Sequence, residues 1–284
     1  MNRIKIGFLG YGTRALDALM EHDGFEVVMF LAPVSRLCTD VYDAKKRYPG
    51  LEFGLVNNND EVYDAFSKAK EKVDCFLMNA CPIILNEKVL SVMPVYNIHP
   101  GDLNKNRGHQ PHMWTVLLGE ESSMIVLHSV TPKIDEGDII SRVVRDIKPD
   151  MDSLEVLDML EDEVPALLDG LYDHLVKNTP PVDRVNGGEY RQIMVYDDYR
   201  FDPDDMNKPG FLDDVLRKIR ARITKNGAFF IHEGKRIYVD KLLDDEVIGS
   251  VGESAKIEFH GSVVFCEKEN RRLVFNVKKK ESNA

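Results

Sequence analysis

Residues 4–32 read IKIGFLGYGTRALDALMEHDGFEVVMFLA and contain the pattern that decides the fold. Two apolar runs, Lys5–Gly10 and Phe25–Ala32, have the length and composition of buried strands. Between them, Thr13–Glu21 repeats its apolar residues at helical spacing, which predicts an amphipathic helix. A strand, a helix and a second strand in this order are typical of a parallel sheet covered by helices.

The same alternation continues through the first half of the chain. We expect strands at Val73–Met78 and Val92–Ile98, and a helix at Glu61–Lys70. The pattern then predicts further segments in this order: a helix at 110–118, a pair of strands at 124–130 and 138–144, and a long helical stretch at 152–177. The predicted fold class is therefore α/β, with a Rossmann-like and mostly parallel sheet.

The composition changes after residue 178, where Thr179, Pro180 and Pro181 interrupt the pattern. Residues 179–210 indicate an irregular connector. From 211 to 284, one helical segment precedes several short β-like runs separated by turn signals. We therefore expect a larger domain at 1–178 and a small, β-rich, OB-like domain at 211–284.

The bulk properties limit the possible partners. The chain has 284 residues and a net charge of −11, which argues against a nucleic-acid partner because phosphate binding relies on basic residues. The sequence contains no apolar run of about 18 residues and starts without a signal-peptide pattern, so we expect no membrane association and a cytoplasmic location. The four cysteines lack CxxC spacing, which predicts buried thiols and no metal site.

Residues 95–101 read VYNIHPG and place two polar side chains at the end of a predicted strand. Asn97 and His99 are two positions apart, so both side chains point to one face of that strand. In an open parallel sheet, ligands bind beyond the carboxyl ends of the strands. An amide beside an imidazole is able to stabilise an oxyanion. A polar strand end with a structural histidine is the alternative that these two residues leave open.

Two later segments add polar groups to this picture. The loop Arg107–Pro111 is unusually polar for a short connection and leads into a predicted helix. Asp135 follows His128 in an Asp-Glu-Gly turn before a predicted strand. A carboxylate there is able to orient His99 and to accept a proton. The alternative is an aspartate that caps a turn before Gly137.

Taken together, these motifs resemble the active-site signature of the folate-dependent formyltransferases, and most closely that of the sugar N-formyltransferases. The matching segments are Asn97-Ile98-His99-Pro100, then Arg107-Gly108 with Pro111 and Trp114, and finally His128 before Asp135-Glu136-Gly137. The resemblance covers roughly residues 3–178 and, more weakly, the C-terminal part. It departs from the family at Gly101, where the family has Ser, and at 103–108, which lacks the family's Pro and Tyr.

The resemblance implies a reaction in which an amine attacks the formyl carbon of N10-formyltetrahydrofolate. It implies that Asn97 and His99 donate to the oxyanion, and that Asp135 orients the imidazole and helps to transfer the proton. It implies a pocket wall for the formyl donor formed by Met78, Ala80, Pro82, Ile83, Leu85, Ile134 and Gly137. For the stretch 81–85, the residues alone favour a core-facing loop instead. Contacts to the acceptor are implied for Arg107, Gly108, His109 and Trp114.

A glycine turn follows the first predicted strand. Gly10 and Gly12 form a GxG pattern before a helix, but Ala15 occupies the third glycine position of a dinucleotide-binding motif. A tight strand-to-helix turn is therefore the favoured interpretation, and a nicotinamide-dependent dehydrogenase is a distant alternative. If the turn binds a ligand, Gly10, Gly12 and Thr13 would hold a phosphate of the acceptor at the helix N-terminus.

The resemblance to the sugar enzymes favours an amino sugar, most simply a nucleotide-linked one, as the acceptor. The runner-up acceptor is methionyl-tRNA, but residues 211–284 carry nearly balanced charges instead of a markedly basic face. The hypothesis from another class is a non-catalytic folate- or nucleotide-binding module of the same fold. A homodimer is a further possibility.

Overall fold

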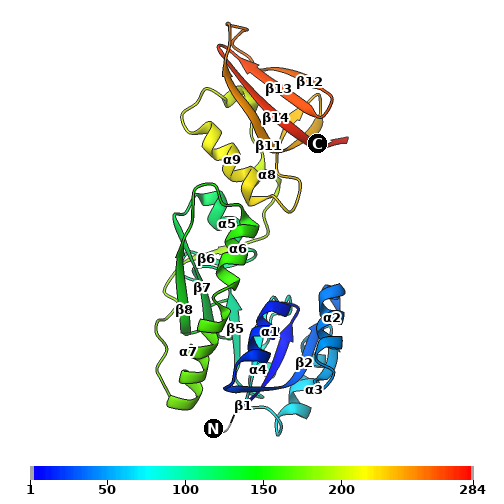
Figure 1. Cartoon of the computed structure of the whole chain (residues 1–284), viewed down its shortest axis with the longest axis vertical. Coiled ribbons are helices and arrows are strands. Elements are labelled where there is room, and N and C mark those ends of the chain that lie inside the picture. The colour runs from blue at the N-terminus through cyan, green and yellow to red at the C-terminus, as the bar shows by residue number, and fades with distance from the viewer. Residues whose placement is uncertain (1–2, 283–284) are drawn as a thin grey trace. The chain divides into compact units, whose positions relative to one another are not determined.

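The computed structural model describes residues 3–282 and divides into two compact units (Figure 1). The first unit comprises the chain up to Pro111, together with Ser122–Arg145 and Asp158–Arg191. The second comprises His112–Glu121, Asp146–Leu157 and the chain from Gln192 onward. The chain passes from the first unit to the second for the last time between Arg191 and Gln192, which lies inside the expected connector. The expected boundaries at 178 and 210 stay a prediction.

The first unit is built on a seven-stranded sheet with the order β3-β2-β1-β4-β5-β7-β8. Its strands are β1 (Ile4–Gly10), β2 (Phe25–Pro33), β3 (Glu52–Val56), β4 (Cys75–Asn79), β5 (Val95–His99), β7 (Ser122–Ser129) and β8 (Ile139–Asp146). The five strands from β3 to β5 pair in parallel, whereas β7 runs antiparallel to β5. The predicted α/β class with a mostly parallel sheet is confirmed.

Helices connect these strands, and the predicted helices are present among them. They are α1 (Thr13–Glu21), the short η1 (Val34–Arg36), α2 (Thr39–Arg47), α3 (Asn59–Ala69), α4 (Glu87–Leu90), α5 (Pro111–Leu118), α6 (Ser153–Glu161) and α7 (Val164–Lys177). The helical stretch expected at 152–177 is formed by two helices, because α6 ends at Glu161 and α7 begins at Val164. Pro165 lies in the first turn of α7, where its missing N–H needs no partner, whereas inside a continuous helix it would remove a hydrogen bond.

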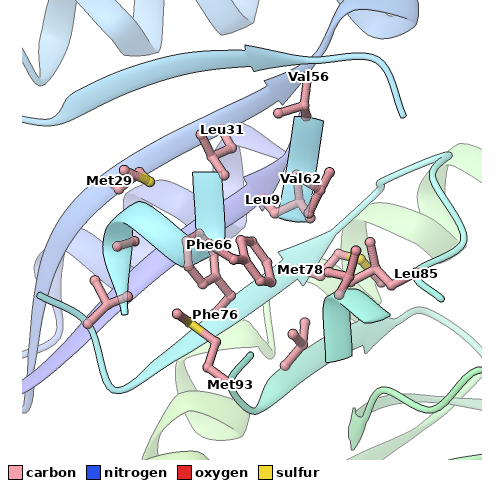
Figure 2. Packing of buried hydrophobic residues seen from close by; sticks show 14 residues of the cluster. Leu9, Met29, Leu31, Val56, Val62, Phe66, Phe76, Met78, Leu85 and Met93 are labelled. Atoms are coloured by element: carbon pink, nitrogen blue, oxygen red, sulfur yellow. The ribbon is translucent and has the colours of Figure 1, made fainter. Parts of the chain in front are cut away.

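A hydrophobic cluster fixes α3 and α4 against the strands (Figure 2). Phe66 of α3 stacks on Phe76 of β4, with ring centroids 4.0 Å apart, and both side chains are fully buried. Figure 2 shows Leu9, Leu31 and Met78 from neighbouring strands around this pair. Burial of such side chains contributes about 1.5–3 kcal/mol each, so this cluster holds β4 in place beside β5.

A small parallel ribbon completes the first unit. It pairs β6 (Asn106–Gly108) with β9 (Glu189–Arg191), although the two segments are far apart in the sequence. Asn106 is fully buried at the start of β6. The carbonyl oxygen of Asn106 lies 3.2 Å from His99 Nε2, so the ribbon contacts the end of β5.

The second unit contains a five-stranded antiparallel sheet with the order β10-β11-β14-β13-β12. Its strands are β10 (Ala228–His232), β11 (Lys235–Val247), β12 (Lys256–His260), β13 (Val263–Lys268) and β14 (Arg271–Ser282). The helix α9 (Phe211–Ala221) packs Phe211, Val215 and Ile219 into its core. The predicted β-rich C-terminal part is confirmed, and its OB-like form stays a prediction.

The expected irregular connector contains short ordered elements, α8 (Tyr196–Tyr199) and η2 (Pro203–Asp205). Phe201 and Met206 from this segment are buried in the core of the second unit. The part of the connector from Gln192 onward therefore contributes to the core of the second unit. Within residues 3–282, no helix combines the length and the apolar character needed to cross a bilayer.

Candidate active site

The carboxyl end of β5 brings three polar side chains together. Asn97 and His99 point from β5 as expected, and the antiparallel register places His128 of β7 directly opposite Asn97. The Asn97 Nδ2 atom lies 3.1 Å from the His128 Nε2 atom. His128 Nδ1 lies 2.9 Å from the carbonyl oxygen of Ser129, an acceptor, so Nδ1 carries the hydrogen and Nε2 accepts from the amide.

Asp135 lies between the two imidazoles. Its Oδ2 atom is 3.5 Å from His99 Nδ1, and its Oδ1 atom is 3.5 Å from His128 Nε2. The backbone N–H of Gly108 donates to Oδ2 at 3.0 Å. The three residues predicted from the sequence are therefore gathered in one place, together with His128, and the side chains are almost fully buried.

The burial of His99 sets its protonation state. Burial lowers the pKa of the imidazole below 6.5, and this effect outweighs the opposing attraction of the Asp135 carboxylate. The neutral ring donates from Nε2 to the carbonyl oxygen of Asn106, 3.2 Å away. The lone pair of Nδ1 then faces the carboxylate of Asp135, so the two groups form a site that is ready to accept one proton.

Asp135 stays ionised although it is mostly buried. Burial by itself raises the pKa of the carboxyl group, but the imidazoles of His99 and His128 and the amide of Gly108 outweigh this effect. The net result is a pKa well below the ordinary value for aspartate. The carboxylate is therefore negative at neutral pH and lies between one ring nitrogen of His99 and one of His128.

The turn that carries Asp135 has an unusual backbone. Asp135 has a φ of 53°, in the left-handed region that few residues other than glycine adopt. Two residues later, a Cβ atom on Gly137 would lie 1.7 Å from the carbonyl oxygen of Ser129. The backbone N–H of Asp138 donates to the Ser129 hydroxyl at 3.0 Å, which closes the turn. Gly137 thus has a steric role, and its contact with a formyl donor stays a prediction.

The remaining residues expected around the formyl donor differ in exposure. Met78 and Leu85 belong to the hydrophobic cluster of the first unit, and Ile83 packs against it. Ala80 and Pro82 are exposed, and Ile134 is half-buried. The residues alone favoured a core-facing loop at 81–85; Ile83 and Leu85 agree with that interpretation, whereas Pro82 and Ile84 are exposed. The contact of the expected residues with a pterin stays a prediction.

The glycine turn after β1 has a steric explanation. A Cβ atom on Gly10 would lie 1.8 Å from the Asn79 carbonyl oxygen, and one on Gly12 would lie 1.6 Å from the Asn79 side-chain oxygen. Asn79 itself is buried, and its amide donates to the carbonyl oxygen of Ile98 at 3.3 Å. The helix α1 begins at Thr13 without a side-chain cap. The role of these residues in phosphate binding stays a prediction.

The expected acceptor contacts are divided between the two units. Arg107 and Gly108 lie beside Asp135, where Arg107 forms an ion pair with Glu136. The backbone N–H of His109 donates to the carbonyl oxygen of Arg191 at 2.9 Å.

Trp114 belongs to the second unit, and its indole donates to the Gln192 carbonyl oxygen at 3.1 Å. Two cavities of that unit, of about 270 and 380 Å³, are lined by none of the site residues. The candidate active site is therefore identified by the geometry around Asp135, because neither cavity contains its residues.

His128 belongs to one of the sequence motifs, but the sequence predicts no role for it in the site. Its importance comes from the pairing of β7 with β5, because the register sets His128 opposite Asn97. The signal in the sequence is a histidine near the end of an otherwise apolar strand, followed by the Asp135 turn.

Residues 40–168 match the sequence model of the family described as formyl transferase. The matched residues include Asn97, His99, His128 and Asp135, so the gathered side chains lie inside the region that is similar to this family.

Three known proteins are similar to the whole chain. The methionyl-tRNA formyltransferase of Ehrlichia canis is 25% identical over 281 residues, covering 92% of this chain and 88% of that protein. HypX from Aquifex aeolicus, solved in complex with tetrahydrofolic acid, matches with a TM-score of 0.65 at 16% identity; the match covers all of this chain but only 46% of HypX. WlaRD, a sugar 3N-formyl transferase solved in the presence of dTDP and 5-N-formyl-THF, matches with a TM-score of 0.66 at 15% identity over 99% of this chain and 100% of WlaRD. At these identities, the two solved structures show that the chain shares their fold.

Proposed function

We propose that this protein transfers the formyl group of N10-formyltetrahydrofolate to the amine of an amino sugar, most simply a nucleotide-linked one. The observation that carries the proposal is the position of Asp135, with one carboxylate oxygen facing each of the imidazoles of His99 and His128. Such an arrangement serves a reaction that moves one proton while negative charge develops on a carbonyl oxygen.

The residues of the site fit the steps of formyl transfer. The acceptor amine forms a bond to the formyl carbon, and negative charge develops on the formyl oxygen. The Asn97 amide has two N–H groups, of which one donates to His128, so the second is left for this oxyanion. The proton of the attacking amine goes to the site between His99 Nδ1 and Asp135 Oδ2. It then moves to the leaving nitrogen as the bond from that nitrogen to carbon breaks.

The formyl donor is inferred from the family and from its structural relatives. The formyl transferase match covers the candidate site, and two of the similar structures were solved with a folate present. The donor supplies an activated formyl carbon. This chain supplies exposed Ala80 and Pro82 and half-buried Ile134 near the strand ends, where the resemblance puts the donor.

The charges of the second unit favour a small acceptor over tRNA. Arg272 of β14 lies opposite Glu246 and Glu267 on the neighbouring strands and bonds both, at 3.0 and 2.6 Å. Arg271 forms a bidentate ion pair with Asp245, in which Nε and Nη2 each donate to one carboxylate oxygen at 2.8 Å. Basic side chains that are neutralised within their own sheet contribute little to binding a phosphate backbone.

Methionyl-tRNA is the second candidate acceptor, because the relative from Ehrlichia canis is similar over nearly the whole chain. The helix α9 carries Arg217, Lys218 and Arg220, and Arg222 follows its last residue. Lys218 pairs with Asp214 at 2.7 Å, and the Arg222 guanidinium lies over the Tyr199 ring at 4.1 Å. These contacts reduce the positive charge available to tRNA, which is why we place tRNA second.

One assay tests both acceptors. The protein is incubated with N10-formyltetrahydrofolate and either nucleotide-linked amino sugars or methionyl-tRNA, and products are analysed by mass spectrometry for an added formyl group. We expect formylation of an amino sugar. Formylation of the tRNA alone would show that tRNA, and not an amino sugar, is the acceptor. If the protein binds folate but formylates neither substrate, the result would favour a non-catalytic binding module. The homodimer and the cytoplasmic location stay predictions.

A further inference from the structure

The strand β6 faces the candidate site with one edge. The backbone carbonyl of Asn106 accepts from His99 Nε2 at 3.2 Å, and the backbone N–H of Gly108 donates to Asp135 at 3.0 Å. Backbone groups two residues apart point to the same side of a strand. One short edge therefore contacts both members of the proton-accepting pair and fixes their separation.

The opposite edge of β6 is paired with β9. The backbone N–H of Glu189 donates to the carbonyl oxygen of Lys105 at 3.2 Å, and the backbone N–H of His109 donates to the carbonyl oxygen of Arg191 at 2.9 Å. The Arg191 side chain also donates to the buried Asn106 side chain at 3.3 Å. The position of His99 and Asp135 thus depends on β9, which begins more than 50 residues after Asp135 in the sequence.

Arg107 fastens this ribbon to the turn that carries Asp135. Its Nη1 atom donates to the carboxylate of Glu136, the residue that follows Asp135. Its Nη2 atom donates at 3.1 Å to the carbonyl oxygen of Gly188, the residue that precedes β9. One guanidinium group therefore connects the turn to both strands of the ribbon.

The two terminal nitrogens of the Arg107 guanidinium bind groups inside the protein, whereas its buried Nε has no hydrogen-bond partner among the described residues. Its side chain is 12% exposed, and both of its terminal nitrogens already have oxygen partners. The same contact lowers the pKa of Glu136, which keeps that carboxylate ionised. A residue that bound the acceptor would instead present these nitrogens to solvent.

We propose that Arg107 is a positioning residue that holds the β6–β9 ribbon and the Asp135 turn together, and so fixes the geometry of His99 and Asp135. This inference rests on the proposed function for its effect on rate. Its structural content can be tested separately.

The kinetic test uses Arg107→Gln, Arg107→Lys and Glu136→Gln. We expect Arg107→Gln to lower kcat by about 100-fold with KM for the acceptor changed by less than about threefold, because misplacement by 1 Å has an effect of this size. Arg107→Lys keeps one charge and should retain part of the rate. Glu136→Gln should lower kcat less than Arg107→Gln, because it leaves the contact between Arg107 and Gly188 in place, and the double variant should be hardly slower than Arg107→Gln alone. A rise in KM with an unchanged kcat would show instead that Arg107 binds the acceptor.

The second test does not depend on activity. The ring nitrogen signals of His99 and His128 are followed by NMR in protein labelled at histidine and are assigned with His99→Gln and His128→Gln. We expect Arg107→Gln to shift both sets of signals. Arg142→Gln, which removes an exposed ion pair with Asp183 in the same unit, should leave them unchanged. Unshifted signals in Arg107→Gln would overturn the inference even in an active enzyme, whereas shifted signals in a protein without transferase activity would overturn only the proposed function.

Discussion

Two turns follow strands of the same parallel sheet, and they differ in what surrounds them. At the carboxyl end of β5, the side chains of Asn97 and His99 meet Asp135 from the turn after β7, and the three have polar partners in one another and in His128. Beyond β1, Gly10 and Gly12 have no side chains, and their backbone packs against Asn79. The comparison teaches that the end of a strand is only a place where chemistry can occur. Buried polar groups that satisfy one another distinguish an active site from a tight turn.

The sharpest test of the comparison is Asp135→Asn. Asparagine tolerates the left-handed backbone at this position, so the fold should persist, but the amide cannot accept the proton. We expect the rate of formyl transfer to fall by at least about 1,000-fold. The rate is measured by the formation of formylated product, and circular dichroism verifies folding. A rate within tenfold of the wild-type rate would show that the β5 end is not the catalytic end.

The next largest effect is expected for Asn97→Ala. This change removes the amide that we assign to the oxyanion and also the hydrogen bond to His128. Loss of one such donor lowers kcat by about 100- to 1,000-fold. Asn86→Ala is a suitable control, because Asn86 caps the short helix α4. Equal rates for the two variants would contradict the role of Asn97.

The glycine turn should respond in stability instead of rate. In Gly12→Ala the new Cβ atom would meet the Asn79 side chain, and overpacking of this kind costs about 1–3 kcal/mol of unfolding free energy. Denaturant unfolding should show this loss, while the rate per folded molecule stays within about twofold.

Gly50→Ala is the matched control for this variant, because a Cβ atom there meets nothing within 4 Å. Asn79→Ala, combined with Gly12→Ala, should recover part of the stability. If Gly12→Ala instead raised KM for the acceptor strongly at unchanged stability, the turn would be a phosphate site and the contrast between the two turns would disappear.

The smallest expected effect is a dependence of stability on pH. The unfolded chain protonates His99 below about pH 6.5, whereas burial lowers the pKa of the folded ring. The contribution of His99 to stability is therefore complete above pH 6.5 and is lost as the pH falls toward the lowered pKa. Tm measured at pH 7.5 and 5.5 should fall less in His99→Gln than in the wild type. An equal fall would mean that burial does not control this imidazole.

Much of the fold could be predicted because its strongest signals are local. The range expected for the first helix, Thr13–Glu21, is the range observed for α1. The helix α2 and the strand β3 were not predicted. The strand β3 lies at the edge of the sheet and only Val56 is buried, so it has no apolar run to reveal it. The connector was underestimated because the burial of Phe201 and Met206 depends on α9 and the C-terminal sheet.

The site was predictable to the extent that its residues share one strand. The spacing of Asn97 and His99 is sufficient to place them on the same face of β5. His128 could not be placed in this way, because its position depends on the antiparallel pairing of β7 with β5. The contacts of Arg107 were also hidden, since they depend on a ribbon formed with residues near 190.

The backbone at position 135 has an evolutionary consequence. An aspartate held at a φ of 53° is less stable than a glycine there, by about 1 kcal/mol. Selection for stability alone would therefore replace it, and only a need for the carboxylate opposes that drift. Among descendants of this chain, glycine at 135 should mark copies that no longer transfer formyl groups, and such copies should unfold at higher denaturant concentration than their active relatives.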